Sequence, residues 1–482
     1  MSRMAVDITI EEALLKVGGF GKFQALLSLI LVLSSYSAGI ITFQFQSLAI
    51  LPDISCVSNR CNALLHEQSL SQSEVICMVR KSEWVYSNPF KNNWAKQFEL
   101  YCEDVYLISL GTTVYFIGFF FGVMVLSSFC DKYGRRVSTL IFLFGYCFVL
   151  ICVKFSTILD QIMILRALCG VLHSGVSISA YVMTCEFLHT KYAVIASLIS
   201  SIAFSLGGST AGYLALINNR WQNCLDLPLL ISAINLLLLY FFCPETPFWL
   251  FAKGKELQAI VSLNEVAKLN RCKALKEVHL ISASKPSPSG KTRSEQSSAK
   301  LLLFTPFLRT AMLKLSVAWF TVAICYYALE FNAGALGTNE YYVMIIMGCT
   351  DFPFKLFIIV LAKRYGRQKA LQWYFTVCAA MLITSAVPFM AFTYLYRSFS
   401  LKTIFVIIGR SLGGANFALL YTYTSEVLPT LSRSTGKAFS FFLTFDELEF
   451  RKILRPLQNQ IILLPYLFKH YFCRNVFLFS LC

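Results

Sequence analysis

Long apolar stretches alternate with short charged breaks along most of this 482-residue chain. A helix needs about 20 apolar residues to cross the hydrocarbon core of a bilayer. Ten stretches come close to that length: 23–50, 105–129, 138–155, 158–185, 194–217, 225–243, 310–331, 342–362, 370–392 and 402–425. The pattern therefore predicts an all-α membrane protein with ten clear spans.

The breaks that carry positive charge alternate with breaks that do not. They are "DKYGRR" at 131–136, "HTKY" at 189–192, the long segment 244–309 and "AKRYGRQK" at 362–369. Lys and Arg resist translocation, so basic breaks stay in the cytoplasm. This distribution predicts a multi-pass protein of the plasma membrane with a cytoplasmic N-terminus and an external loop at 51–104.

The composition supports a membrane class over a nucleic-acid-binding one. Hydrophobic residues make up 56% of the chain and charged residues 14%, against about 25% charged residues in soluble domains. The net charge of +16 could suggest a nucleic-acid partner. However, the basic residues gather in the breaks between spans, which is typical of cytoplasmic loops, so we expect a lipid bilayer and no nucleic acid.

The external loop holds four cysteines, Cys56, Cys61, Cys77 and Cys102. In an oxidising compartment four cysteines favour two disulfides, for which three pairings are open, over four free thiols. No Cys-x-x-Cys spacing or histidine cluster points to a metal. We therefore expect neither a metal nor a cofactor.

The segment 244–309 divides the chain. It starts with a sequence that has the pattern of an amphipathic helix. It continues at 284–300 with a Ser/Lys-rich stretch that has too few apolar residues to fold. We interpret it as a cytoplasmic linker and favour a plain tether over a phosphorylation site. It separates an N-terminal half, 1–243, from the first four spans of a second half, 310–437, and a divergent tail, 438–482.

Two short sequence motifs recur in the same order on both sides of the linker. "KYGR" at 132–135 returns as "RYGR" at 364–367, and "RALCG" at 166–170 returns as "RSLGG" at 410–414. The offsets are similar, 232 and 244 residues. This predicts two six-helix halves of the same orientation, a plan of transporters that rock about a midplane site. In the first copy, Gly134 permits a tight bend.

These features resemble the major facilitator superfamily and, within it, the transporters of organic cations, organic anions and carnitine. The stretches that carry the likeness are "EALLKVGGFGKFQ" (12–24), "WVYSNPFKNNWAKQFELYC" (84–102), "GVMVLSSFCDKYGRR" (122–136), "PETPFWL" (244–250), "YYALEFNAGALG" (326–337) and "SEVLPTLSRSTG" (425–436). The resemblance implies the major facilitator fold.

One stretch leans toward the anion branch of that family. "DFPFKL" at 351–356 resembles a motif of organic anion carriers in which the Lys contacts substrate. A lysine in a lipid span must face a cavity or a partner, so Lys355 is a candidate for substrate binding, unless it only pairs with Asp351 one turn away. Tyr326 and Tyr327 resemble a tyrosine pair of the family, with packing as the alternative role. Glu330 departs from the family and favours cations.

Other charged residues fall into two groups. Arg166 and Arg410, early in the fourth and tenth spans, could bind a substrate carboxylate, although we favour a role in tying spans together. We expect the second group to form a cytoplasmic charge network that stabilises one conformational state. Its members are Asp131, Gly134, Arg135, Arg136, Glu186, Glu245, Arg364, Arg367, Glu426 and Arg433.

The chain departs from the family mainly after Gly436. The apolar runs at 438–445 and 461–468 are too short to span a bilayer, so the second half is expected to be incomplete. The leading hypothesis is a secondary transporter of small organic ions that favours anions and works by alternating access and exchange against a counter-ion. The alternatives are an organic cation or carnitine transporter and a truncated member that does not transport. We expect no enzyme activity.

Overall fold

A computed structural model describes most of the chain. The described residues are 6–51, 53–64, 72–88, 90–188, 190–275, 278–281, 306–331, 339–386 and 401–427. The divergent tail and the Ser/Lys-rich stretch at 284–300 lie outside these ranges, and so does Arg433.

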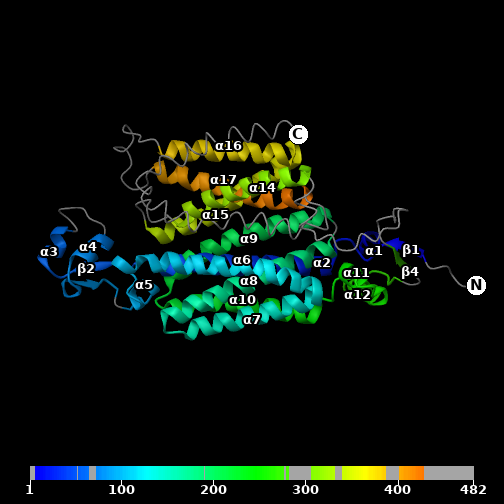
Figure 1. The fold of residues 1–482 in the computed structure, drawn as a ribbon, viewed down its shortest axis with the longest axis horizontal. Coiled ribbons are helices and arrows are strands. Elements are labelled where there is room, and N and C mark those ends of the chain that lie inside the picture. The colour runs from blue at the N-terminus through cyan, green and yellow to red at the C-terminus, as the bar shows by residue number, and fades with distance from the viewer. Residues whose placement is uncertain are drawn as a thin grey trace, which may run out of the picture.

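In the described part of the chain, ten long helices run side by side along the molecule (Figure 1). They are α2 (Lys22–Leu48), α6 (Tyr106–Tyr133), α7 (Arg135–Phe155), α8 (Leu159–Phe187), α9 (Thr190–Ile217), α10 (Asp226–Phe242), α14 (Pro306–Phe331), α15 (Glu340–Tyr365), α16 (Arg367–Ala386) and α17 (Leu401–Val427). Each overlaps one predicted stretch. Among the described helices, eight are long and apolar enough to cross a membrane. The total of ten spans stays a prediction, because α14 and α16 are not among the eight.

The long helices form two groups, which we call the N-terminal half (α2 and α6–α10) and the C-terminal half (α14–α17). Within the first, α2 packs on α9 and α6 packs on α8; within the second, α17 packs on α14, α15 and α16. The halves meet where α15 lies against α9. Outward faces expose large apolar side chains such as Phe144 and Phe155, as expected for surfaces that lipid covers.

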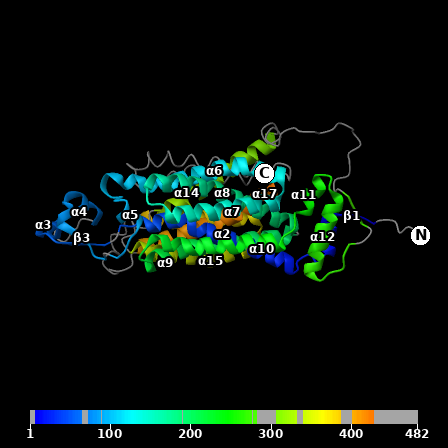
Figure 2. The same ribbon diagram turned by 90° about the horizontal axis from the view of Figure 1, so that it is seen from below.

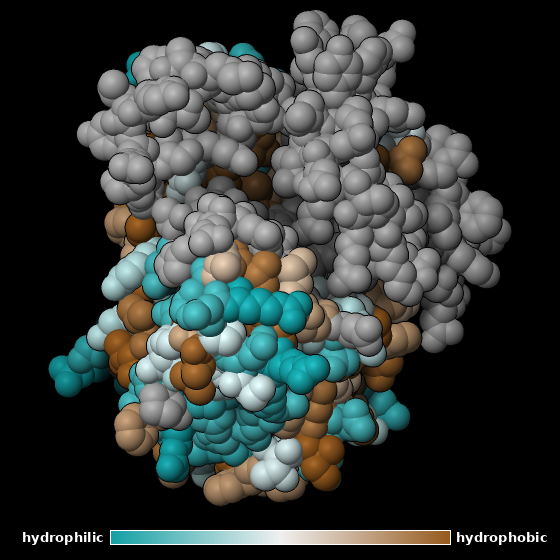
Figure 3. All heavy atoms as spheres, turned by 90° about the vertical axis from the view of Figure 1, so that its left-hand side faces the viewer, coloured by the Kyte–Doolittle hydropathy of each residue, from teal (hydrophilic) through white to brown (hydrophobic). Residues whose placement is uncertain are grey.

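A small domain caps one end of the bundle. It contains β2 (Ile54–Cys56), α3 (Asn59–Asn62), α4 (Gln72–Met78), η2 (Lys81–Glu83), β3 (Trp84–Tyr86), α5 (Trp94–Gln97) and η3 (Cys102–Val105). β2 and β3 pair antiparallel, with Ile54 opposite Tyr86. Seen from this end, hydrophilic side chains cover much of the described surface (Figure 3), as befits a domain in water.

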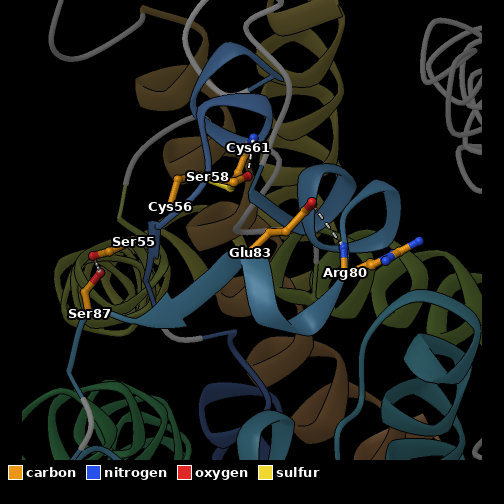
Figure 4. Close-up of a disulfide and its surroundings, with 7 residues drawn as sticks. All are labelled: Ser55, Cys56, Ser58, Cys61, Arg80, Glu83 and Ser87. Carbon is orange, nitrogen blue, oxygen red and sulfur yellow. Dashed lines mark hydrogen bonds between the residues drawn. A yellow bond between two sulfur atoms is a disulfide. The ribbon is translucent and has the colours of Figure 1, made fainter.

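Two disulfides hold this domain together, which confirms that part of the sequence prediction. They join Cys56 to Cys61 and Cys77 to Cys102, and so select one of the three open pairings. In Figure 4, Ser58 lies beside the first bridge and accepts a hydrogen bond from the backbone of Cys61.

The opposite end of the bundle carries β1 (Val6–Thr9), α1 (Ile10–Lys16), α11 (Pro247–Ala252), α12 (Glu256–Asn270) and β4 (Val278–Ile281). β1 and β4 pair in parallel, with Val6 opposite Val278. α12 runs across the bundle axis (Figure 2), and Asn270 at its end accepts a hydrogen bond from Phe23 N at the start of α2, at 2.9 Å. The first part of segment 244–309 is thus packed on the N-terminal half.

Candidate functional site

Four charged side chains and a tyrosine lie together where the two halves meet. α15 supplies Asp351 and Lys355, one turn apart; α14 supplies Tyr326 and Glu330; α17 supplies Arg410. None is more than 4% exposed. We call these five residues the interface cluster. Asp351 lies near the middle of α15, so the cluster is far from both ends of the bundle.

Arg410 is the centre of the cluster. Its Nη1 donates to Asp351 Oδ1 at 2.6 Å and to the carbonyl oxygen of Met347 at 2.7 Å. Its Nη2 donates to the Tyr326 hydroxyl at 2.8 Å, and the guanidinium lies 4.4 Å from the centre of that ring. Nη2 also lies 2.8 Å from Glu330 Oε2, a contact that is ionic and lacks hydrogen-bond geometry. Arg410 therefore ties α14, α15 and α17 together, as the favoured structural role requires.

Lys355 links the C-terminal half to the N-terminal half. Its Nζ donates to the carbonyl oxygen of Ser201 at 2.7 Å and to Ser205 Oγ at 2.5 Å, both on α9. Asp351 Oδ2 is 3.7 Å away and accepts a hydrogen bond from Ser205 at 2.7 Å. Lys355 Nζ is therefore closer to the two serine oxygens than to the carboxylate of Asp351, whose own shortest ionic contact goes to Arg410 at 2.6 Å.

The two serines of α9 were missed in the sequence. Ser197, Ser201, Ser205 and Ser209 recur at every fourth residue, which places them on one face of a helix. That polar stripe in an apolar span was the signal that could have found them.

The charges of the interface cluster balance. Arg410 and Lys355 are cationic, and Glu330 and Asp351 are anionic, so the formal sum is zero. Moving such charges out of water costs free energy, and removing one partner of a buried pair leaves the other charge uncompensated. Charged residues within spans are rare and mark substrate or ion pathways.

Aromatic rings extend the cluster toward the N-terminal half. The ring of Tyr327 lies 6.3 Å from Phe43 on α2 and 5.3 Å from Phe116 on α6, measured between centroids. Tyr326 lies 6.4 Å from Phe43. The predicted tyrosine pair therefore spans the boundary between the halves, where it also packs, so both of its proposed roles fit the geometry.

The predicted charge network is assembled at the α6–α7 turn. Arg135 Nη2 lies 3.0 Å from Asp131 Oδ1 and 3.1 Å from Glu186 Oε1. This joins α6, α7 and α8 at the end of the bundle that carries α11 and α12.

Glu245 completes this network from the other side. Its Oε1 accepts from the backbone N–H of Arg135 at 2.8 Å and of Arg136 at 3.1 Å. An anion is stabilised at the N-terminus of a helix such as α7. Gly134 has φ 102°, and a Cβ there would lie 2.4 Å from Glu245 Oε2, so the glycine both bends the chain and makes room for the carboxylate.

The second copy of this turn is built differently. Gly366 has φ 89°, but within the described part of the chain nothing beyond its immediate neighbours lies within 4 Å of its Cβ position. Arg364 is exposed and stacks over Tyr365 at 5.5 Å, while Arg367 begins α16. The side chain of Glu426 lies outside the described residues. The structure thus brings together the first-half members of the network, whereas in the second half it shows Arg364 on the exposed surface beside Tyr365.

Arg166 lies apart from the interface cluster, inside the N-terminal half. Its Nε donates to the carbonyl oxygen of Gly111 at 3.2 Å, and its guanidinium lies over the ring of Phe45 at 4.3 Å and of Tyr115 at 5.1 Å. Nearby, His173 is hydrogen-bonded to the Tyr115 hydroxyl; it belongs to no motif in the sequence that indicated a role. In the described ranges, no group of three or more His, Cys, Asp or Glu residues could hold a metal.

Two groups of long helices that meet along a buried interface are the architecture of the major facilitator fold. Solved structures agree. The xylose transporter XylE from E. coli, in a partially occluded inward-open conformation, matches with a TM-score of 0.56 and 15% identity, over 89% of this chain and 92% of that one. The human organic anion transporter MFSD10 matches with a TM-score of 0.54 and 14% identity, over 88% of this chain and 90% of that one. Identities this low show the fold alone.

The chain belongs to the sugar (and other) transporter family, whose model matches residues 69–445. Organic anion transporter 3 of Oryctolagus cuniculus is 29% identical over 74% of this chain and 65% of its own length. Solute carrier family 22 member 3 of Mus musculus is 26% identical over 89% of this chain and 84% of its own length. The chain thus spans about two thirds of the first of these relatives. The resemblance stated from the sequence is confirmed, and the relatives are transporters and not enzymes.

Proposed function

We propose that this chain moves small organic ions across the plasma membrane by alternating access, with organic anions as its main substrates and its N-terminus in the cytoplasm. The observation that carries the proposal is Lys355, a buried lysine of the C-terminal half whose hydrogen bonds go to Ser201 and Ser205 of the N-terminal half. A cation at the boundary between two rocking halves is well placed to meet an anionic substrate.

The proposed mechanism is an exchange of partners at this boundary. When α9 and α15 separate, Lys355 loses both serine contacts and turns to the opened cavity. A substrate carboxylate then takes the place of those acceptors, while Tyr326 and Tyr327 offer ring faces to its apolar part. Departure of the substrate, or its replacement by an exchanged counter-ion, lets the halves close again.

Glu330 favours a second candidate function, transport of organic cations. Its carboxylate is buried beside Arg410 and balances one of the two positive charges of the interface cluster. If substrates are cations, this carboxylate is their partner. If substrates are anions, it lowers the attraction for them.

Charge variants in an uptake assay separate the two functions. We expect Lys355→Ala to reduce uptake of a small aromatic carboxylate at least tenfold and Lys355→Arg to retain more of it, because the second variant keeps the charge. Glu330→Gln, which leaves the cluster with a net positive charge, should lower the KM for the carboxylate. The control is Glu265→Gln, an exposed position on α12.

Surface amounts of each variant are measured in parallel. Loss of organic cation uptake in Glu330→Gln, in a protein that never carries carboxylates, would contradict the anion assignment and support the cation function. Uptake of neither class by the parent chain would favour a member that does not transport.

A further inference from the structure

We propose that the N-terminal half holds a binding site for a small inorganic anion of the chloride class, centred on Arg166 and separate from the interface cluster. The site lies between α2, α6 and α8. The inference does not rest on the proposed function, because it concerns binding within one half and not transport.

Arg166 is a buried cation without a carboxylate. Its side chain is 6% exposed, and no ion pair to it occurs among the described residues. Its Nε is used by the Gly111 carbonyl, whereas its Nη2 is buried and has no hydrogen-bond partner in the described part of the chain. The rings of Phe45 and Tyr115 give it only partial compensation.

The repeat within the chain supplies an internal comparison. Arg166 opens "RALCG" and Arg410 opens "RSLGG", and each guanidinium lies over a tyrosine ring, Tyr115 or Tyr326. Arg410 has two carboxylates within 3 Å, but the described residues around Arg166 provide none. The same motif therefore has its counter-charge built in at one site and missing at the other.

A cavity adjoins Arg166, and other unsatisfied donors line it. Its walls include Gln44, Trp94 and Arg166. Gln44 Nε2 and Trp94 Nε1 are buried without a hydrogen-bond partner among the described residues, as is Arg166 Nη2. All three groups are N–H donors. A water molecule that filled the cavity would bring two protons of its own, whereas a halide ion only accepts.

The volume of the cavity limits the size of the ligand. The space open to a water-sized molecule is about 20 Å³, which is enough for ~1 water molecule. A monatomic anion fits this space, and an aromatic carboxylate does not. The remaining wall is largely apolar, with Leu48, Leu150 and Val153 among its residues, so charge–charge attraction there is weakly screened.

Halide binding to the purified full chain in lipid nanodiscs tests the proposal. Chloride is titrated against gluconate at constant ionic strength, and the melting temperature is followed; a saturable rise is expected. Arg166→Gln should abolish the rise. Arg60→Gln removes an exposed arginine of α3 and should leave it unchanged. Bromide replaces chloride for direct location, with anomalous density expected beside Arg166.

A second variant covers the case in which Arg166→Gln does not fold. Trp94→Phe keeps the ring and removes one donor, and should weaken chloride binding about tenfold. The proposal is overturned if halide does not change the melting temperature of the parent protein. It is also overturned if halide raises the melting temperature of Trp94→Phe as much as that of the parent protein. Competition by benzoate for the same site would overturn its restriction to small anions.

Discussion

Arg166 and Arg410 show how far the surroundings of one residue decide its role. Both begin the same short motif, both are buried, and both stack on a tyrosine. Arg410 contacts Asp351 and Glu330, so it acts as a structural tie, whereas Arg166 retains an unused donor. The motif alone predicts the same role for both residues, because it carries no information on partners in other helices.

At the same scale, the charge balance of the interface cluster makes a prediction about Arg410. Arg410→Gln leaves Glu330 and Asp351 buried with only Lys355 to compensate them. Removing one partner of a buried ion pair costs about 3–5 kcal/mol, so we expect a large fall in melting temperature in detergent. The double variant Arg410→Gln with Glu330→Gln restores a formal charge of zero and should recover much of the loss. A double variant less stable than the single one would contradict the balance.

The cluster residues could be predicted singly from the sequence, but their pairing could not. Lys355 and Asp351 stand out as charges in an apolar stretch and lie one turn apart, so their proximity follows from helical geometry. Arg410 lies 59 residues from Asp351 and Ser205 lies 146 residues from it. Contacts across such separations depend on how the helices pack, which a single sequence does not specify.

At the scale of elements, the apolar stretches predicted the long helices well, because length and hydropathy are set locally. The parallel pair of β1 and β4 was missed. Each of these strands has four residues, and their pairing joins the N-terminus to the segment after α12. Strands this short, whose partners are distant in the sequence, are not predicted by the local pattern of apolar and polar residues.

Close packing of α6 on α8 leads to a prediction about one glycine. A Cβ added to Gly170 would lie 2.0 Å from the carbonyl oxygen of Tyr115, so these backbones approach as small residues allow in membrane helices. Gly170→Ala should push the helices apart and reduce the yield of monodisperse protein severalfold. Gly413→Ala is the matched control, since none of the described residues places an atom within 4 Å of that Cβ position in α17. Equal yields from the two variants would argue against the tight contact.

At the scale of the whole molecule, the two halves are joined mainly through α9 and α15. Besides the hydrogen bonds of Lys355, Ser209 Oγ donates to the carbonyl oxygen of Ile345 at 2.9 Å. A Cβ on Gly348 would lie 2.1 Å from Ser209 Oγ. The small domain with two disulfides and the α11–α12 segment lie at opposite ends of the bundle (Figure 1). This arrangement suits a protein whose halves separate along α9 and α15 and expose their interface to each end in turn.

A cross-link between α9 and α15 tests this motion directly. Ser209 Oγ lies 3.7 Å from Sγ of the native Cys349, so Ser209→Cys should form a disulfide between the halves under mild oxidation. Because alternating access requires α9 and α15 to separate, we expect oxidation to stop uptake almost completely and a reductant to restore it. A protease site placed at 284–300 reports the cross-link, since cleaved halves then stay together on a denaturing gel. Ser209→Cys with Cys349→Ser is the control that should neither cross-link nor respond to oxidation. Full uptake by cross-linked protein would show that the contact between α9 and α15 persists through the transport cycle, and the site would then have to open elsewhere.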